Sequence, residues 1–283
     1  MKRTLLYIAF IAVLGCMASC DVIDEDNRYI EEESAGPSDR VQRVLAEEFT
    51  GRMCVNCPDG AAVIHDIQAA YGDRVVAIGI HAGRFAVPYG YFADMDLRTP
   101  AGNAYNEAFP YEGNPAAMFN RSVNNGAIVS TNKDVWLTIA DKELAKEPVC
   151  ELTPTCEYDA ATRTLNITTE VYAWKNMPAD LKLQVQLTED GIVASQQTST
   201  GIDYEYVHNH VLRTAVNGTW GETMSSLLEG ESATYKHTIV LDEAWVAENC
   251  NVVVFAYENV SKSVLQCNDC AVVAATDDNI TEE

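Results

Sequence analysis

Apolar positions along the chain change their spacing near Pro148. Before this residue, continuous apolar runs alternate with amphipathic stretches of helical period, and Gly72 follows the longest of these stretches. The predicted elements are strands at 41–49, at 74–83 and after Pro115, and helices at 57–71, 101–109 and 133–147. This order, a βαβ unit followed by a strand and a helix, is typical of a layered α/β domain.

After Pro148 the apolar positions follow a period of two. Short alternating runs recur up to the C-terminal region, and turn residues separate them at the intervals of an all-β sandwich. The sequence therefore predicts an α/β domain over 41–147, followed by an immunoglobulin-like β-sandwich over 148–275. The remaining predicted segments are a signal peptide (1–20), an acidic flexible tether (21–40) and an acidic tail (276–283).

The N-terminus predicts export and lipidation. Lys2 and Arg3 precede an apolar run that is shorter than a membrane span requires. Small residues precede both Cys16 and Cys20, as in the lipobox of bacterial lipoproteins, where cleavage leaves a lipidated cysteine. We favour Cys20 because Ala-Ser precedes it and an acidic stretch follows it, and Cys16 is the alternative. The mature protein is then anchored to a membrane by acyl chains.

The formal net charge of −23 argues against binding to nucleic acid or to an anionic membrane through charge. No motif predicts a cofactor. His208 and His210 would share one face of a strand, but no third ligand accompanies them, so no metal site is predicted.

Two of the nine cysteines, Cys54 and Cys57, lie in the stretch FTGRMCVNCPDG. A pair at this spacing can chelate zinc, form a static disulfide or cycle between dithiol and disulfide. Zinc would need a second pair, and the candidate pair Cys267–Cys270 lies in the other predicted domain. A static disulfide across so small a loop removes little entropy from the unfolded chain. At a strand-to-helix junction, in contrast, helix N–H groups favour a thiolate at Cys54, which would attack, while Cys57 would resolve the mixed disulfide.

The stretch Val44–Pro58 resembles the active-site strand, turn and helix start of thioredoxin-like proteins. This resemblance implies a thioredoxin-like fold for the first domain. It implies that Pro115 is the family's cis-proline beside the two sulfurs. It also implies that Glu48 is the buried acid that relays a proton from Cys57; the alternative is that Glu47 points inward and Glu48 faces solvent. Met53 departs from the family, which has tryptophan there.

The lipidation signal, the C-x-x-CP segment, the sandwich-like second half and the segment HNHVLRTAVNGTWGE together resemble the outer membrane protein 28-related lipoproteins. This resemblance implies a lipid-anchored protein of the outer membrane that faces the periplasm or the cell surface. The predicted function is thiol–disulfide exchange with protein thiols or disulfides of the envelope. The alternative is a binding or adhesion lipoprotein on a non-catalytic scaffold, in which Cys54–Cys57 is a static disulfide.

Five further cysteines remain in the second half. Cys150 and Cys156 would share one strand face, too far apart to bond with each other, and each could pair with Cys250 or Cys267 on a neighbouring strand. Cys267 and Cys270 could instead form a second exchange-competent pair.

Overall fold

A computed structural model describes residues 40–274 of the chain, and strands predominate in this part. The elements of its first half are β1 (Val44–Thr50), α1 (Cys57–Tyr71), β2 (Val75–His81), α2 (Pro100–Ala108), β3 (Ala116–Phe119) and α3 (Trp136–Leu144). Each of these elements was predicted from the spacing of apolar residues to within a few positions. Gly72, the predicted end of the first helix, follows α1 directly with a positive φ of 62°, which glycine adopts without strain.

The second half consists of strands and turns. Its longer strands are β4 (Cys150–Asp159), β5 (Thr164–Ala173), β6 (Leu181–Glu189), β13 (Ser232–Val240), β14 (Cys250–Glu258) and β15 (Val264–Ala271). Its shorter strands are β7 (Ile192–Val193), β8 (Gln196–Thr198), β9 (Gly201–Asp203), β10 (Val207–His208), β11 (Val211–Ala215) and β12 (Glu222–Thr223). The predicted alternation holds along β5, where buried and exposed residues alternate.

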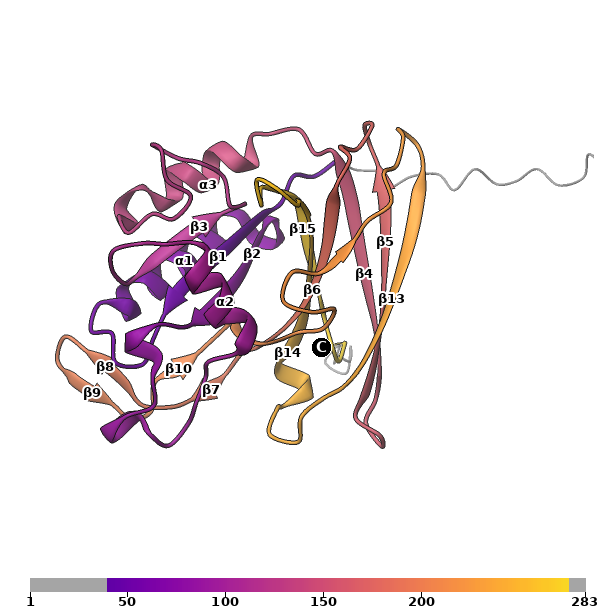
Figure 1. The fold of residues 1–283 in the computed structure, drawn as a ribbon. Helices are drawn as coiled ribbons and strands as arrows, with labels where there is room; N and C mark the ends of the chain where they lie inside the picture. Colours follow the sequence, from indigo (N-terminus) through magenta and orange to yellow (C-terminus); the bar gives the residue numbers. More distant parts are fainter. Residues whose placement is uncertain (1–39, 275–283) are drawn as a thin grey trace, which may run out of the picture. The chain divides into compact units, whose positions relative to one another are not determined.

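One eight-stranded sheet joins the two halves of the chain (Figure 1). Its strands follow the order β15-β14-β6-β11-β2-β1-β3, and β12 also pairs with β6. Strand β11 connects the halves, because it pairs with β6 on one side and runs parallel to β2 on the other. The contact with β2 is at Gly79, whose register partner in β11 is Val211. The Gly79 amide also donates to the His210 carbonyl at 2.7 Å.

The predicted fold, an α/β thioredoxin-like domain followed by a separate immunoglobulin-like sandwich, is therefore wrong. The strands β1 to β3 do not form a sheet of their own, because β11 extends the same sheet into β6, β14 and β15. The described residues, 40–274, all belong to one compact unit. The pairing that overturns the prediction is between residues far apart in sequence, so local apolar spacing carries no sign of it.

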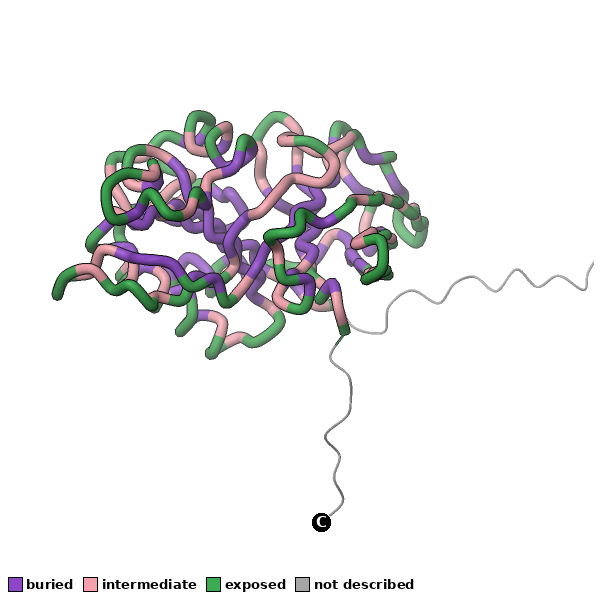
Figure 2. Tube along the Cα trace, turned by 90° about the horizontal axis from the view of Figure 1, so that it is seen from below, coloured by how far each residue is buried: buried purple, intermediate pink, exposed green. Residues whose placement is uncertain are grey.

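The hydrophobic cores follow the two faces of this sheet. On one face, α2 covers a cluster that mixes both halves, with Phe49 and Ile80 packed in the same cluster as Phe255 and Tyr257. On the other face, α1 and α3 cover β1 to β3, while the three-stranded sheet β13-β5-β4 packs against β6 and β14. Figure 2 shows the buried residues gathered in the interior and the exposed residues along the outer loops. The candidate site lies on the face that α1 covers.

Candidate functional site

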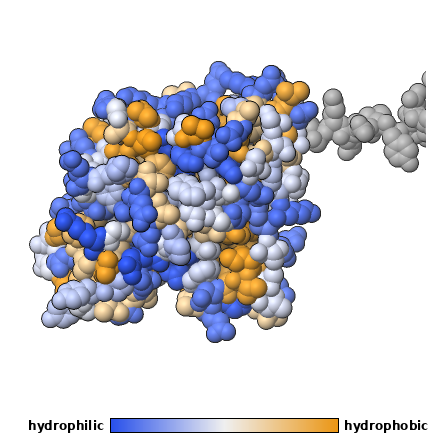
Figure 3. Space-filling model, viewed as in Figure 1, coloured by the Kyte–Doolittle hydropathy of each residue, from blue (hydrophilic) through white to orange (hydrophobic). Residues whose placement is uncertain are grey.

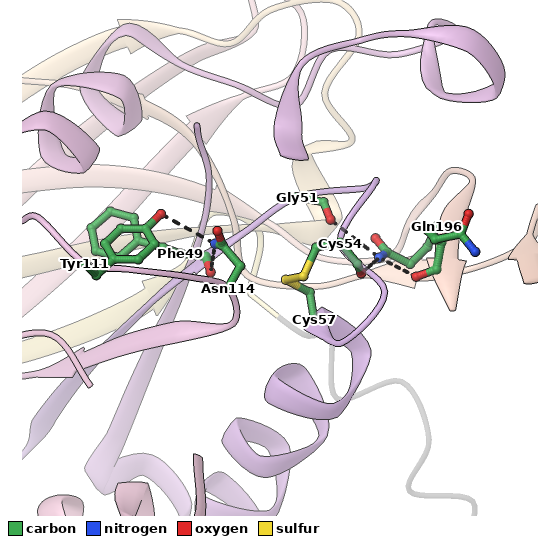
Figure 4. Close-up of a disulfide and its surroundings, with 8 residues drawn as sticks. Phe49, Gly51, Cys54, Cys57, Tyr111, Asn114 and Gln196 are labelled. Atoms are coloured by element: carbon green, nitrogen blue, oxygen red, sulfur yellow. Dashed lines mark hydrogen bonds between the residues drawn. A yellow bond between two sulfur atoms is a disulfide. The ribbon is translucent and has the colours of Figure 1, made fainter. Parts of the chain in front are cut away.

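Cys54 and Cys57 form a disulfide at the start of α1, where the sequence predicted a strand-to-helix junction (Figure 4). Their Cα atoms are 5.4 Å apart. Asn56 occupies the N-cap position of the helix, and Pro58 lies in its first turn, where its missing N–H costs no hydrogen bond. Each cysteine is only 2% exposed. Both sulfurs are therefore shielded from solvent.

Arg52 fixes the loop that carries Cys54. Its buried guanidinium donates to the Ser195 carbonyl at 2.8 Å and to the Met95 carbonyl at 2.6 Å, and it pairs with Asp94 at 2.6 Å. The Met53 amide also donates to the Phe85 carbonyl at 2.9 Å. These bonds tie the loop to two distant segments. Sequence reasoning missed Arg52, because nothing in a charged loop residue signals that it is buried.

Asn114, the residue before Pro115, lies beside the Cys54–Cys57 disulfide (Figure 4). The Asn114–Pro115 peptide bond is cis, as the resemblance implied. The Asn114 side-chain amide donates to the Phe49 carbonyl at 2.8 Å, and Figure 4 shows the disulfide between Asn114 on one side and Gln196 on the other.

Gly60 brings Glu48 and Pro115 together against the first turns of α1. A Cβ atom at Gly60 would lie 2.6 Å from the Glu48 Oε1 atom and 2.6 Å from the Pro115 Cβ atom. Only glycine leaves room for both groups, so this position determines how closely they approach the helix that begins at Cys57.

Glu48 is buried and has no partner for its Oε1 atom. Burial raises the pKa of Glu48 to about 8, because the ionised carboxylate would lose its hydration. The alternative, in which Glu47 points inward and Glu48 faces solvent, is not what the structure has. Both residues are buried on opposite faces of the sheet, and Glu47 is paired with Arg121 at 2.6 Å.

A cavity of about 270 Å³ adjoins the Cys57 side of the disulfide. The polar side chains that line it include Glu48, Cys57, His81, Tyr206 and His208; Cys54 and Pro115 do not line it. Burial lowers the pKa of His81 well below its usual value and that of His208 to about 4. The two rings pack edge to face at 5.3 Å. At neutral pH the His81 and His208 rings are therefore neutral and the Glu48 carboxyl group is largely protonated.

The segment 195–198, which we call the cover, lies over the disulfide loop. The Gln196 side-chain amide donates to the Cys54 carbonyl at 2.9 Å. The Gln197 backbone amide donates to the Arg52 carbonyl at 2.8 Å. The cover comes from the second half of the chain, and neither Gln196 nor Tyr206 belongs to a motif that could have signalled its position.

Both histidines of HNHVLR line the cavity. His210 also has its Nδ1 atom 3.1 Å from Asp190. Within residues 40–274 no group of three or more His, Cys, Asp or Glu residues is arranged to hold a metal ion.

The five further cysteines are free thiols. Cys267 lies in the cluster under α2, whereas Cys270 packs against the cluster between the sheets, so these two side chains are on opposite faces of β15. The alternative in which Cys267 and Cys270 pair with each other is therefore not what the structure has.

The predicted lipidation residue Cys20 and its alternative Cys16 lie outside the described residues, as do the signal peptide and the acidic tail. Among the helices of residues 40–274, none has the length and apolar character needed to cross a membrane.

The fold and the site define a β-rich protein with a shielded C-x-x-C disulfide at a helix start. The chain belongs to the outer membrane protein Omp28 family, whose model matches residues 102–275. This confirms the resemblance and the predicted outer-membrane location, because the family is one of outer membrane proteins. The matched stretch contains Pro115 and the cover, but it begins after the C-x-x-C motif.

Solved structures are similar to this chain over most of its length. HBP35 of Porphyromonas gingivalis matches with a TM-score of 0.65 at 16% identity, over 86% of this chain and 82% of that one. Protein AGR_C_4864 from Agrobacterium tumefaciens matches with a TM-score of 0.53 at 14% identity, over 84% of this chain and 98% of that one. At these identities the matches show the fold alone.

A domain of the outer membrane lipoprotein Omp28 from Porphyromonas gingivalis is 25% identical over 44% of this chain and 88% of that one, with a TM-score of 0.33. Among curated proteins, none matches this sequence significantly.

Proposed function

We propose that this outer membrane lipoprotein exchanges disulfides with extracytoplasmic proteins through Cys54 and Cys57. The observation that carries the proposal is the unpaired, buried Glu48 carboxyl group, which lines the same cavity as Cys57. With its pKa raised to about 8, this carboxyl group can take up and release a proton near neutral pH. Such a proton is needed at the Cys57 sulfur, because this sulfur must be protonated when the disulfide opens.

In the oxidised form, a substrate thiolate attacks the Cys54 sulfur and the Cys54–Cys57 bond breaks. The electron pair goes to Cys57, which takes its proton from Glu48. The second substrate thiol then displaces Cys54, so the substrate becomes a disulfide and the pair becomes two thiols. Two electrons and two protons pass from the substrate to the protein, and the reverse sequence reduces a substrate. Because both sulfurs are shielded, exchange requires the cover to move away from the Cys54 loop.

Trapping of the mixed disulfide tests this function. In the Cys57→Ser variant the resolving thiol is missing, so we expect Cys54 to accumulate mixed disulfides with envelope proteins, resolved on non-reducing gels. A Cys54→Ser/Cys57→Ser variant is the matched control and should trap nothing. Alkylation after equilibration in glutathione buffers should show a redox transition of the pair. Absence of both trapping and transition refutes exchange.

A second candidate function, surface binding with a static disulfide, is favoured by exposed apolar side chains near the cover. Tyr89 and Tyr91 are 75% and 70% exposed, and the Tyr91 carbonyl accepts a hydrogen bond from the Ser195 hydroxyl at 2.9 Å. Val193 and Val207, register partners on β7 and β10, are also exposed. On the face drawn in Figure 3, apolar residues form several separate patches among hydrophilic ones.

Protease treatment of intact cells separates the two candidates. A protein that faces outward should be cleaved from intact cells, and a surface location favours binding because no electron donor is evident there. Full protection from the protease argues for a periplasmic location and for exchange.

A further inference from the structure

The edge strands of two sheets meet along one side of the core between them. β4 is an edge of the three-stranded sheet, and β15 is an edge of the eight-stranded sheet. The Asn268 side-chain amide donates to the Leu152 carbonyl at 2.7 Å, and the Gln266 side-chain amide donates to the Cys150 carbonyl at 3.2 Å. Side chains of β15 thus hold the neighbouring backbone of β4 at fixed positions.

Further along the same two strands, the sulfur atoms of Cys156 and Cys270 lie 2.7 Å apart. A disulfide bond measures about 2.05 Å, so these atoms are within about 0.7 Å of bonding distance. Both residues are half-buried, which leaves the pair within reach of an oxidant. We propose that Cys156 and Cys270 form a disulfide in the exported protein, which joins the edges of the two sheets.

The other three thiols have no comparable arrangement. Cys150 and Cys250 are fully buried in the core between the sheets, and Cys267 lies on the opposite face of β15. The hydrogen bond with Cys156, and then burial, raise the pKa of the Cys270 thiol. Neither Cys156 in β4 nor Cys270 in β15 lies at a helix N-terminus, the feature that favours a thiolate at Cys54. The bond is therefore a structural one, distinct in role from the Cys54–Cys57 pair.

Formation of the bond needs an oxidant of the disulfide class, such as a protein disulfide or oxidised glutathione. One thiolate of the pair attacks a sulfur of the oxidant, which forms a mixed disulfide and releases one oxidant thiolate. The other thiol of the pair then attacks the mixed disulfide, forms the Cys156–Cys270 bond and releases the second oxidant thiolate. The pair loses two electrons and two protons, and the oxidant becomes two thiols. An outer-membrane location, reached through an oxidising envelope, supplies such conditions.

The bond would close a long loop, since Cys156 and Cys270 are 114 residues apart. Cross-links over long loops remove the most conformational entropy from the unfolded chain. β15 is also the last strand of the described chain, and it contacts the cores on both faces of the sheet. A covalent link to β4 would keep this strand from separating from both cores.

Thiol counting tests the proposal directly. The full-length protein is equilibrated with oxidised glutathione, denatured without reductant and alkylated. Of the seven cysteines in residues 40–274, we expect three to be alkylated, namely Cys150, Cys250 and Cys267. Mass spectrometry should find the peptides of Cys156 and Cys270 linked. Alkylation of both residues after this treatment overturns the proposal.

Single and double variants test it by stability. Cys156→Ser and Cys270→Ser should each lower the Tm of the oxidised protein by on the order of 5–10 °C, because each removes the same bond. The double variant should then melt at the same temperature as either single variant. Additive losses in the double variant would mean that the two side chains act separately, and the proposal would be wrong.

Discussion

Glu47 and Glu48 are neighbours on β1, but their carboxyl groups lie in opposite surroundings on the two faces of the sheet. On the α2 face, Glu47 receives two hydrogen bonds from Arg121, at 2.6 and 2.7 Å. The rings of Tyr105, Phe109, Phe255 and Tyr257 surround this guanidinium at 4.9 to 5.4 Å. On the α1 face, Glu48 has an oxygen without a partner and borders a cavity.

The difference separates a structural use of a buried carboxyl group from a chemical one. Glu47 is paired with Arg121, and this guanidinium contacts rings from both halves of the chain, so the pair fixes the common core. Glu48 is uncompensated and lowers the stability of the fold at neutral pH. A fold that keeps such a group beside a disulfide is more easily explained by function than by packing.

We expect the largest effect on stability from removing Arg121, the partner of Glu47. Arg121→Met leaves a buried carboxylate unpaired, and we expect a loss of about 4 kcal/mol in the free energy of unfolding, measured by urea denaturation. Arg98→Met is the matched control, because Arg98 forms an exposed pair with Asp96 and should cost less than about 1 kcal/mol. Equal losses in the two variants would contradict the structural role of the Glu47–Arg121 pair.

Glu48→Gln should change the free energy of unfolding in the opposite direction and stabilise the protein. The pKa of Glu48 rises from 4.5 to about 8 on folding, so the unfolded chain ionises first as the pH increases. The group therefore costs nothing below about pH 4.5 and destabilises the fold increasingly up to about pH 8. Removing it should stabilise the protein by roughly 3 kcal/mol at pH 7 and leave it unchanged at pH 4.

The measurement is the difference in unfolding free energy between the variant and the wild type across this pH range. Glu112→Gln, at an exposed position, is the control and should show no such slope. A flat difference for Glu48→Gln would mean that Glu48 is not held neutral, and the proton-transfer role would lose its basis.

The sequence predicted the local elements around this site because their signals are local. Helical spacing and Gly72 give the extent of α1, and Pro115 marks the start of β3. Glu48 and Pro115 both approach Gly60 of α1, and Glu48 lines the same cavity as Cys57. Strand alternation predicts that the two glutamates face opposite sides of the sheet, but it does not say which of them faces α1. The pairing of Glu47 with Arg121 was not predicted either, because their separation of 74 residues leaves no periodic signal.

The sheet that joins the halves could not be predicted for the same reason. β11 is five residues long and meets β2 at the single register pair Val211 and Gly79. Neither residue differs from others in the chain until the two strands are placed side by side. The position of the cover could not be predicted either, because Gln196 and its hydrogen-bond partner Cys54 are 142 residues apart in the sequence. The shielding of Cys54 was not predicted, because the shielding segment comes from the other half of the chain.

The variant Gly60→Ala tests whether Gly60 determines how closely Glu48 approaches α1. The added Cβ atom would meet both the Glu48 carboxyl oxygen and the Pro115 ring at 2.6 Å, so one of them must move. We expect a loss of about 2 kcal/mol in unfolding free energy, and a change in the pKa of Glu48. Gly113→Ala is the control, since a Cβ atom there meets nothing within 4 Å. If both variants behave alike, the contact at Gly60 does not determine the position of Glu48.

The smallest expected effect concerns the cover on the Glu48 side of the sheet. Gln196→Ala removes the hydrogen bond to the Cys54 carbonyl and should cost about 1 kcal/mol in global stability. Its larger consequence is access, so a phosphine reductant should open the Cys54–Cys57 bond several-fold faster. Gln197→Ala is the matched control, because that side chain donates only to the Thr198 carbonyl at 3.1 Å and should leave the rate unchanged. Equal reduction rates in both variants would show that Gln196 does not control the access of the reductant to the disulfide. The two faces of β1 would then differ only in how their buried carboxyl groups are paired.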